Sequence, residues 1–361
     1  MHFYESTIIK SKDGLQVKSY TNEHPEGFVI AKPKYIPTTY IKSDKLPIRT
    51  LDGQEVNRFD YWIDNQELKN YIEKFKEAYP DYYYECDLYN TWFFGIPKKK
   101  IQEVPDGRKG VERILNLQEN ELDEYMTIAQ KFIQLLENSG VSYKDMGVTN
   151  STILGTYTYG RSDIDLIIYG KQNYWDVIEF MKDAKHEMLR WKTLAEWKKY
   201  YSTYNAGLNF NEEQFIWQAE RKYADGFFGE TVFSIFGVSE PEETYAKWGT
   251  EKCTPMGEII LKADVLDNYH AAVRPGYYEL ENSKIIESPS RVDKNTKIDL
   301  VVTFARDFML QAFKGERIAA KGLLEKVESL DGSRDDYYRV AVGYFDSYVS
   351  RIGEEFIKVD R

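Results

Sequence analysis

Two aspartates, Asp163 and Asp165, stand at the start of an apolar run in the sequence SDIDLIIYG. The aliphatic and β-branched residues that follow them are typical of a buried β-strand. Side chains alternate between the faces of a strand, so both carboxylates are expected to point the same way from its N-terminal end. Two carboxylates this close raise each other's pKa unless a cation lies between them. The pair therefore predicts a site for Mg²⁺ or Mn²⁺, which bind oxygen ligands and leave positions for substrate phosphates.

The segment NSTILGTYTYGR just before the aspartates has the composition of a phosphate-binding turn. A serine hydroxyl and free backbone N–H groups at the start of a helix can bind phosphate. The candidate nucleotide-binding residues in this turn are Asn150, Ser151 and Thr152. Together with the aspartates they predict a nucleoside triphosphate bound with two metal ions, which can stabilise the attacking and leaving oxygens of a phosphoryl displacement.

A structural alternative is that Asp163 and Asp165 only cap an exposed turn, as Asp often does. The Asn-Ser turn before them and the apolar strand after them favour the metal and nucleotide site. The sequence contains no Gly-x-Ser-x-Gly elbow, no Walker-type loop and no Gly-x-Gly-x-x-Gly turn. The four histidines have no metal-ligand spacing, so we expect them to be structural or surface residues.

The order of a Ser, a helical turn ending in Gly, and then SDIDL resembles the signature of the polymerase-beta-type nucleotidyltransferase superfamily. The resemblance implies that Asp163 and Asp165 bind the catalytic metals and that Ser151 contacts the nucleotide phosphates. Two longer segments, GLQVKSYTNEHPEGFVIAKPKYIP and VTFARDFMLQAFKGERIAAKGLLEKV, are similar to an archaeal group of predicted nucleotidyltransferases without an established substrate. That second resemblance would cover nearly the full chain.

The sequence departs from the superfamily pattern at two places. Asn150 stands where the superfamily has Gly, whose backbone can approach phosphate closely, although Asn tolerates left-handed backbone angles better than most residues. The superfamily also places a third carboxylate on a later strand of the same sheet. The expected strand ETVFSIFGV has no acidic residue in its interior, so Glu230 at its start is the candidate third catalytic carboxylate. Asp264 and Asp267 are the alternatives.

Four basic residues near these segments are candidates for holding the triphosphate: Arg161, Lys171, Arg221 and Lys222. An exposed surface charge explains each of them equally well. Arg161 is the preferred candidate because it directly precedes the metal turn, and Lys171 follows the strand.

Composition limits the class of protein. A chain of 361 residues is long enough for two or three domains, and its net charge of −11 argues against a broad nucleic-acid-binding surface. No apolar run is long enough to span a membrane, and the first residues do not resemble a secretory signal, so we expect a cytoplasmic protein. Cys86 and Cys253 are expected to be ordinary buried thiols.

We predict an α+β fold in which a central polymerase-beta-like nucleotidyltransferase α/β domain, residues 111–245, lies between two β-rich regions, 1–110 and 246–361. The C-terminal region is expected to form a small sheet or barrel. The following elements are also predicted: a hairpin at 6–20, helices at 65–79, 119–138, 173–189, 193–203, 211–222 and 305–315, a strand at 231–238, and a connecting segment at 92–110.

The sequence thus predicts a metal-dependent nucleotidyltransferase that moves a nucleoside monophosphate from an NTP to an acceptor hydroxyl and releases pyrophosphate. The acceptor stays open among an RNA end, a protein and a small molecule, as do the base preference and the oligomeric state. The alternative is a non-catalytic nucleotide- or RNA-binding protein that keeps the fold. A third possibility is that the C-terminal region is an RNA-binding barrel that presents tRNA.

Overall fold

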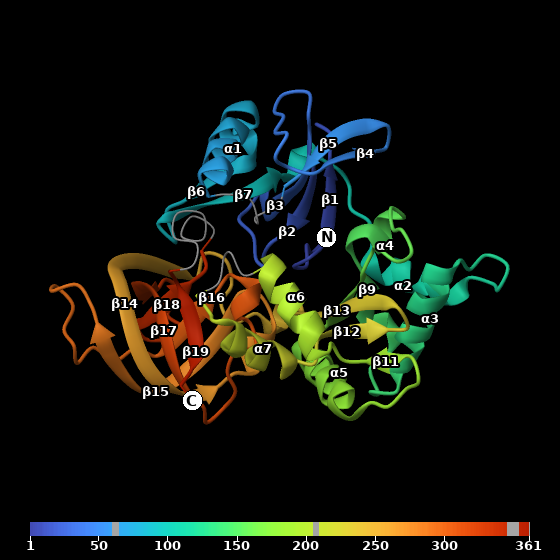
Figure 1. Ribbon diagram of the computed structural model, residues 1–361. Coiled ribbons are helices and arrows are strands. Elements are labelled where there is room, and N and C mark those ends of the chain that lie inside the picture. Colours follow the sequence, from blue (N-terminus) through green and yellow to red (C-terminus); the bar gives the residue numbers. More distant parts are fainter. Residues whose placement is uncertain (60–64, 205–208, 345–353, 361) are drawn as a thin grey trace.

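The computed structural model describes residues 1–59, 65–204, 209–344 and 354–360, and Figure 1 shows their arrangement. Three β-sheets follow one another along the chain, and the described part contains seven α-helices, so the fold mixes α and β structure. The N-terminal sheet, the central sheet and the C-terminal sheet meet around a shared centre (Figure 1). None of the described helices has the length and apolar character needed to cross a bilayer.

The N-terminal sheet has eight strands, six of them in the order β4-β5-β3-β2-β1-β8, with β7 pairing β3 and β6. The predicted hairpin at 6–20 is confirmed as β1 and β2. Helix α1 (Asn65–Ala78), also predicted, packs Tyr71, Ile72 and Phe75 against the sheet because these residues recur at helical spacing. The strands are β1 (Ile8–Ser11), β2 (Gln16–Ser19), β3 (Phe28–Pro37), β4 (Ile48–Leu51), β5 (Gln54–Arg58), β6 (Tyr83–Cys86), β7 (Thr91–Pro97) and β8 (Ile101–Glu103).

The prediction of a connecting segment at 92–110 is wrong. Strand β7 occupies its first residues and pairs with β3, with Val29 opposite Ile96. Pro97 lies at the end of this strand, where its missing N–H costs little, so the proline does not exclude a strand here. The last residues of the segment begin a helix, α2.

The central sheet has the strand order β11-β12-β13-β10-β9, in which β10 and β13 are parallel and the other neighbours are antiparallel. The predicted helices at 119–138, 173–189, 193–203 and 211–222 appear as α3, α5, α6 and α7, and the predicted strand at 231–238 appears as β13. The strands are β9 (Met146–Val148), β10 (Ile164–Tyr169), β11 (Leu189–Arg190), β12 (Asp225–Phe228) and β13 (Thr231–Val238). The helices are α2 (Gly107–Asn116), α3 (Glu124–Glu137), α4 (Asn150–Leu154), α5 (Lys171–Asp183), α6 (Leu194–Tyr204) and α7 (Glu212–Glu220).

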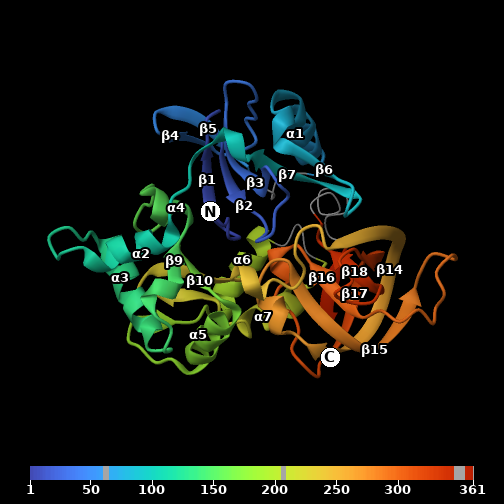
Figure 2. The ribbon, with the colours of Figure 1, turned by 180° about the vertical axis from the view of Figure 1, so that it is seen from behind.

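The two faces of the central sheet have different neighbours. Ile164, Leu166 and Ile168 of β10 join a core with residues of α2, α3 and α5, the helices seen beside this sheet in Figure 2. The alternate residues, Ile167 and Tyr169, pack with Tyr4 of the N-terminal region. The face covered by helices therefore packs into the core of the central unit. The opposite face is directed toward the N-terminal sheet and the C-terminal barrel.

The C-terminal sheet closes on itself. Its strand order is β14-β15-β16-β18-β17, and β14 also pairs with β17. Strand β19 pairs with residues 318–321 of β17. The closed set is a five-stranded barrel, which has no free edge along its closure. The strands are β14 (Glu251–Asp267), β15 (Gly276–Glu287), β16 (Leu300–Thr303), β17 (Arg317–Ser329), β18 (Tyr337–Val342) and β19 (Phe356–Val359).

The predicted helix at 305–315 is wrong. Only a 3₁₀ turn, Arg306–Phe308, forms there. Phe308, Leu310 and Ala312 are all buried, and Leu310 has a φ of +53°, which a helix cannot accommodate. The rest of the segment is irregular, and its side chains pack against the barrel and the central sheet.

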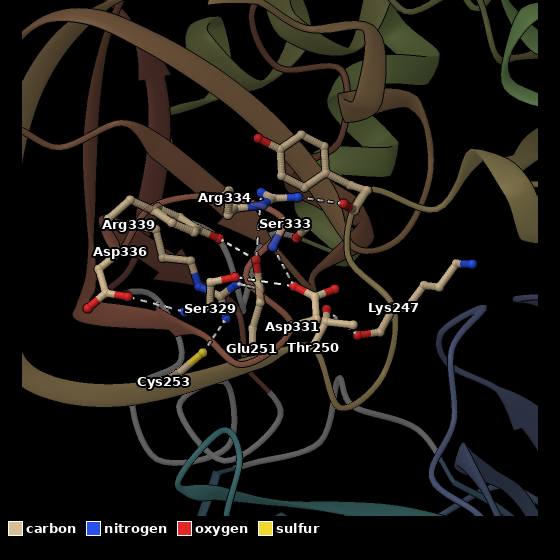
Figure 3. Close-up of polar contacts among 12 residues, drawn as sticks. Lys247, Thr250, Glu251, Cys253, Ser329, Asp331, Ser333, Arg334, Asp336 and Arg339 are labelled. Atoms are coloured by element: carbon tan, nitrogen blue, oxygen red, sulfur yellow. Dashed lines mark hydrogen bonds and ion pairs between the residues drawn. The ribbon is translucent and has the colours of Figure 1, made fainter.

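A buried ion cluster lies on the outer face of β17 and β18, the face turned away from the barrel core (Figure 3). The Arg339 side chain is 0% exposed; its Nε donates to Glu325 at 2.8 Å, and one Nη donates to Glu251 at 3.2 Å. The other Nη donates to the sulfur of Cys253 at 3.0 Å and to the Tyr344 hydroxyl at 3.1 Å. Cys86 and Cys253 are both free and buried, as predicted.

Candidate active site

Asp163 and Asp165 lie at the start of β10, as predicted, and Asp165 is directed to the sheet face opposite the helices. Ile164 and Leu166, its neighbours in the strand, enter the helix-covered core, so strand alternation sends Asp165 the other way. Asp165 lines a cavity of about 280 Å³. Burial, and then the nearby charge of Asp165, raise the pKa of Asp163 from 3.8 to about 6. The two carboxylates are therefore close enough to interact electrostatically.

A third carboxylate, Asp225, lies on the same face. Asp165 of β10 pairs with Ser234 of β13, and Ser234 pairs with Asp225 of β12. Paired residues of adjacent strands point to the same face, so these three side chains form a row across the sheet. The Ser234 hydroxyl donates to Asp225 at 2.6 Å, and the charge of Asp225 contributes to the raised pKa of Asp163.

The sequence analysis did not identify Asp225. The short strand DGFF contains a Gly and follows directly on α7 and a turn, so it gave no clear alternating pattern. The predicted third carboxylate, Glu230, lies in the turn between β12 and β13, beyond the ends of both strands. We therefore assign Asp225, and not Glu230, as the candidate third carboxylate.

The two alternative carboxylates lie outside the cavity. Asp264 in β14 accepts hydrogen bonds from Arg317 at 3.0 Å and from Asn282 at 2.9 Å. Asp267 accepts from the backbone N–H of Tyr269. Both therefore have structural partners in the barrel region, and neither lines the cavity.

The phosphate-binding turn predicted at 150–152 has the expected backbone at its first residue. Asn150 has a φ of +53°, in the left-handed region where Asn replaces Gly at least cost. Asn150 lines the cavity, and its Oδ1 accepts a hydrogen bond from Lys34 of β3. Thr152 is buried and shares a hydrogen bond of 2.6 Å with the Tyr125 hydroxyl, which also donates to the backbone oxygen of Asp163. Thr152 thus stabilises the turn through this hydrogen bond and does not line the cavity.

Of the four predicted basic residues, one lines the cavity and three do not. Lys222 lines the cavity, where it donates to the backbone oxygen of Asp307 at 3.0 Å. Arg221 forms an ion pair with Glu316, and Lys171 contacts the backbone oxygen of Glu243 and the ring of His270. Arg161 is an exposed turn residue. None of these last three residues lines the cavity.

Other cations, which the sequence analysis missed, occupy the cavity instead. Lys18 comes from β2, Lys192 from the segment after β11, and Arg274 and Arg306 from the C-terminal unit. Burial lowers the pKa of Lys18 to about 8, and burial also lowers that of Lys34 to about 7. The charge of Asp165 acts in the opposite direction on both lysines, which places them near the carboxylates.

Aromatic side chains of α6 and α7 form another wall of the cavity. The rings of Tyr200 and Phe215 are stacked, with centroids 6.0 Å apart and an angle of 17° between planes. Trp197 is buried beside them, and the Lys192 ammonium lies 4.7 Å from its ring centroid. Flat aromatic surfaces of this kind can bind a nucleobase by stacking.

The described residues contain no set of three or more His, Cys, Asp or Glu side chains placed to hold a metal ion by themselves. Asp225 is separated from Asp165 by a full strand, and its oxygen is hydrogen-bonded to Ser234. The Asp163 and Asp165 pair suits a hard divalent cation that also binds substrate phosphates, since such ions take only one or two protein carboxylates in many nucleotide sites.

Comparison with known proteins gives one full-length similarity. The chain is 28% identical over 360 residues to an uncharacterised protein of the archaeon Methanocaldococcus jannaschii, and the similarity covers 98% of each chain. This supports the predicted similarity to an archaeal group of uncharacterised proteins. No family model and no solved structure matches the chain.

Binding of Mn²⁺ is expected to strengthen as pH rises through about 6. Burial and the charge of Asp165 hold the pKa of Asp163 at about 6, and a carboxylate must lose its proton to bind a cation. Affinity should therefore increase between about pH 5 and pH 7 and then level off. Calorimetric titration with Mn²⁺ at several pH values measures this. The Asp264→Asn variant, changed outside the cavity, should keep the same profile, and a flat wild-type profile would contradict the prediction.

Proposed function

We propose that this protein is a metal-dependent nucleotidyltransferase with a polymerase-beta-like central domain, which transfers a nucleoside monophosphate from an NTP to an acceptor hydroxyl. The observation that carries the proposal is the row of Asp165, Ser234 and Asp225 across three strands. Asp163 lies beside this row, and the cavity in front of it contains buried cations. Carboxylates for a metal and cations for phosphates are the two requirements of phosphoryl transfer.

In the proposed reaction, the acceptor hydroxyl oxygen attacks the α-phosphorus of the NTP. The bond between the α-phosphorus and its bridging oxygen to the β-phosphate breaks, and pyrophosphate leaves. Asp225, oriented by its hydrogen bond from Ser234, takes the proton of the hydroxyl. Asp163 and Asp165 would hold Mg²⁺, which neutralises charge on the phosphate oxygens when it is bound.

The surroundings of the carboxylates suit the rest of an NTP. Asn150 lines the cavity with Asp165, whereas the adjoining Ser151 does not, and Lys34 connects this turn to the N-terminal sheet through its hydrogen bond to Asn150. The stacked rings of Tyr200 and Phe215 offer a surface for the base. The nucleotide would thus extend from the turn at Asn150 toward α6 and α7.

The second candidate is a non-catalytic nucleotide- or RNA-binding protein with the same fold. Two observations favour it: Asn150 stands where the superfamily has Gly, and the described carboxylates do not converge into a three-residue metal group. Calorimetry with ATP and Mg²⁺, performed beside a transfer assay with α-labelled NTPs and a mixed set of acceptors, separates the two. Release of pyrophosphate with label transfer supports the enzyme, and nucleotide binding without any transfer supports the second candidate.

A further inference from the structure

We propose that the acceptor is a small hydroxylated molecule with a phosphate or carboxylate group, and that Lys18, Arg274 and Arg306 bind this anionic group. The inference rests on the proposed function, because it identifies the substrate that would receive the nucleotide. It is carried by cations and buried amides that line the cavity beyond the three carboxylates.

Two of the cations lie near Phe236, which is farther along β13 than Ser234 in the row of carboxylates. The Lys18 ammonium lies 5.1 Å from the ring centroid of Phe236, and the Arg306 guanidinium lies 3.1 Å from it. Phe236 follows Ser234 by two residues on the same strand face, which corresponds to about 6.6 Å along the strand. A molecule with its hydroxyl at the carboxylates would therefore place a group about five or six bonds away beside these cations.

Two of these cations form no direct polar contact with the part of the protein that the structure describes. Neither the Lys18 ammonium nor the Arg306 guanidinium forms a hydrogen bond or ion pair with any residue in the described ranges, although Glu5 and Asp307 also line the cavity and the charge of Glu5 acts on Lys18. Arg274 forms an ion pair with Glu5 at 3.2 Å, yet its Nε is buried without a hydrogen-bond partner in the described part of the chain. A phosphate or carboxylate group between the three side chains would supply the missing acceptor oxygens.

Two buried amides in the same cavity indicate hydroxyl groups on the ligand. Gln218 is 4% exposed and Gln311 is 3% exposed, and both line the cavity. The amide oxygen of each has no hydrogen-bond partner among the described residues. A buried amide oxygen without a donor is unfavourable, so a ligand that brings hydroxyl donors would bind well there.

The location of these groups favours a small acceptor over an RNA end or a protein. Lys18 comes from the N-terminal sheet, Gln218 from α7, and Arg274 and Arg306 from the C-terminal unit. Arg274 is only 8% exposed. These side chains line one cavity of about 280 Å³ between the three units, whereas a polyanion is bound along an extended row of cations.

The test uses inorganic phosphate as the probe, added to the full chain saturated with Mg²⁺ and a non-hydrolysable ATP analogue. Calorimetry should detect phosphate binding, and the Lys18→Gln and Arg306→Gln variants should each weaken it by about tenfold or more while still binding the analogue. Arg317→Gln, which changes an arginine of the barrel outside the cavity, is the matched control and should bind phosphate as the wild type does. Circular dichroism and thermal unfolding establish that each variant is folded.

Other outcomes separate this inference from the proposed function. Phosphate binding to the free chain but not to the chain saturated with the ATP analogue would overturn the inference, because the cations would then hold the triphosphate, and the proposed function would stand. Equal transfer of label to RNA ends by wild type and Lys18→Gln would also overturn it. Phosphate binding that depends on Lys18 and Arg306, in a protein that binds no nucleotide, would overturn both the proposed function and the role of this site in holding an acceptor.

Discussion

Replacing Asp165 with Asn is expected to lower metal-dependent nucleotide transfer by about 10²- to 10³-fold while the protein stays folded. The Asn side chain has the same size but no negative charge, so it weakens metal binding without creating a cavity in the sheet. Asp163→Asn should have a similar effect, since Asp163 lies beside Asp165 and interacts with its charge. Initial rates with α-labelled NTP, at saturating Mg²⁺, measure the loss. Wild-type rates in both variants would disprove the proposed role of the pair.

A matched pair of variants tests the third carboxylate. Asp225→Asn should lower the rate about as strongly as Asp165→Asn, because Asp225 shares its sheet face through Ser234. Glu230→Gln, in the turn outside the row, should leave the rate within about twofold of wild type. The reverse ranking would restore Glu230 as the third carboxylate and remove Asp225 from the proposed reaction.

Replacing Arg339 with Met is expected to lower the free energy of unfolding by about 3 to 5 kcal/mol. Arg339 and Glu325 are both 0% exposed, so removal of the guanidinium leaves the Glu325 carboxylate buried without a cation, while Glu251 keeps Arg334 at 3.6 Å and the Tyr337 hydroxyl. Burial already raises the pKa of Glu325 even with Arg339 present. The urea concentration at the midpoint of unfolding, followed by circular dichroism, measures the effect.

The control for this prediction is an arginine ion pair of the same barrel that is open to solvent. Arg317 lies 3.0 Å from Asp264 and is 44% exposed, so Arg317→Met should cost no more than about 1 kcal/mol. Adding Glu325→Gln to Arg339→Met should recover part of the loss, since the uncompensated charge is then removed. Equal effects of the two single Arg variants would mean that the buried cluster has no special role in stability.

The central part of the site could be predicted from the sequence because its signals are local. Asp163, Asp165 and the apolar strand after them occur within a few residues, and β13 has a continuous apolar pattern. Asn150 has the left-handed backbone that Asn tolerates better than most residues. Asp225 was missed because its strand has only four residues and includes a Gly, so strand periodicity had too few positions to show.

The cations could not be predicted because they are distant in sequence from the aspartates. Lys18 lies in a short hairpin strand where an outward lysine is the ordinary expectation, and Arg306 lies in a segment that was predicted to be a helix. Only the packing of the N-terminal sheet and the C-terminal barrel against the central sheet turns them toward Asp165. Arg161 and Lys171 were predicted because they are close to Asp163 and Asp165 in the sequence, but neither of them lines the cavity.

The cavity is lined by side chains from the N-terminal sheet, the central sheet with α6 and α7, and the C-terminal unit. An isolated central domain would therefore retain its three aspartates but would lack Lys18, Arg274 and Arg306. The two flanking units are consequently not interchangeable modules that only recruit partners. During evolution, a change in the hairpin at β1 and β2 or in the turn after β16 would therefore alter the lining of the cavity directly, even though neither segment carries an aspartate of the row.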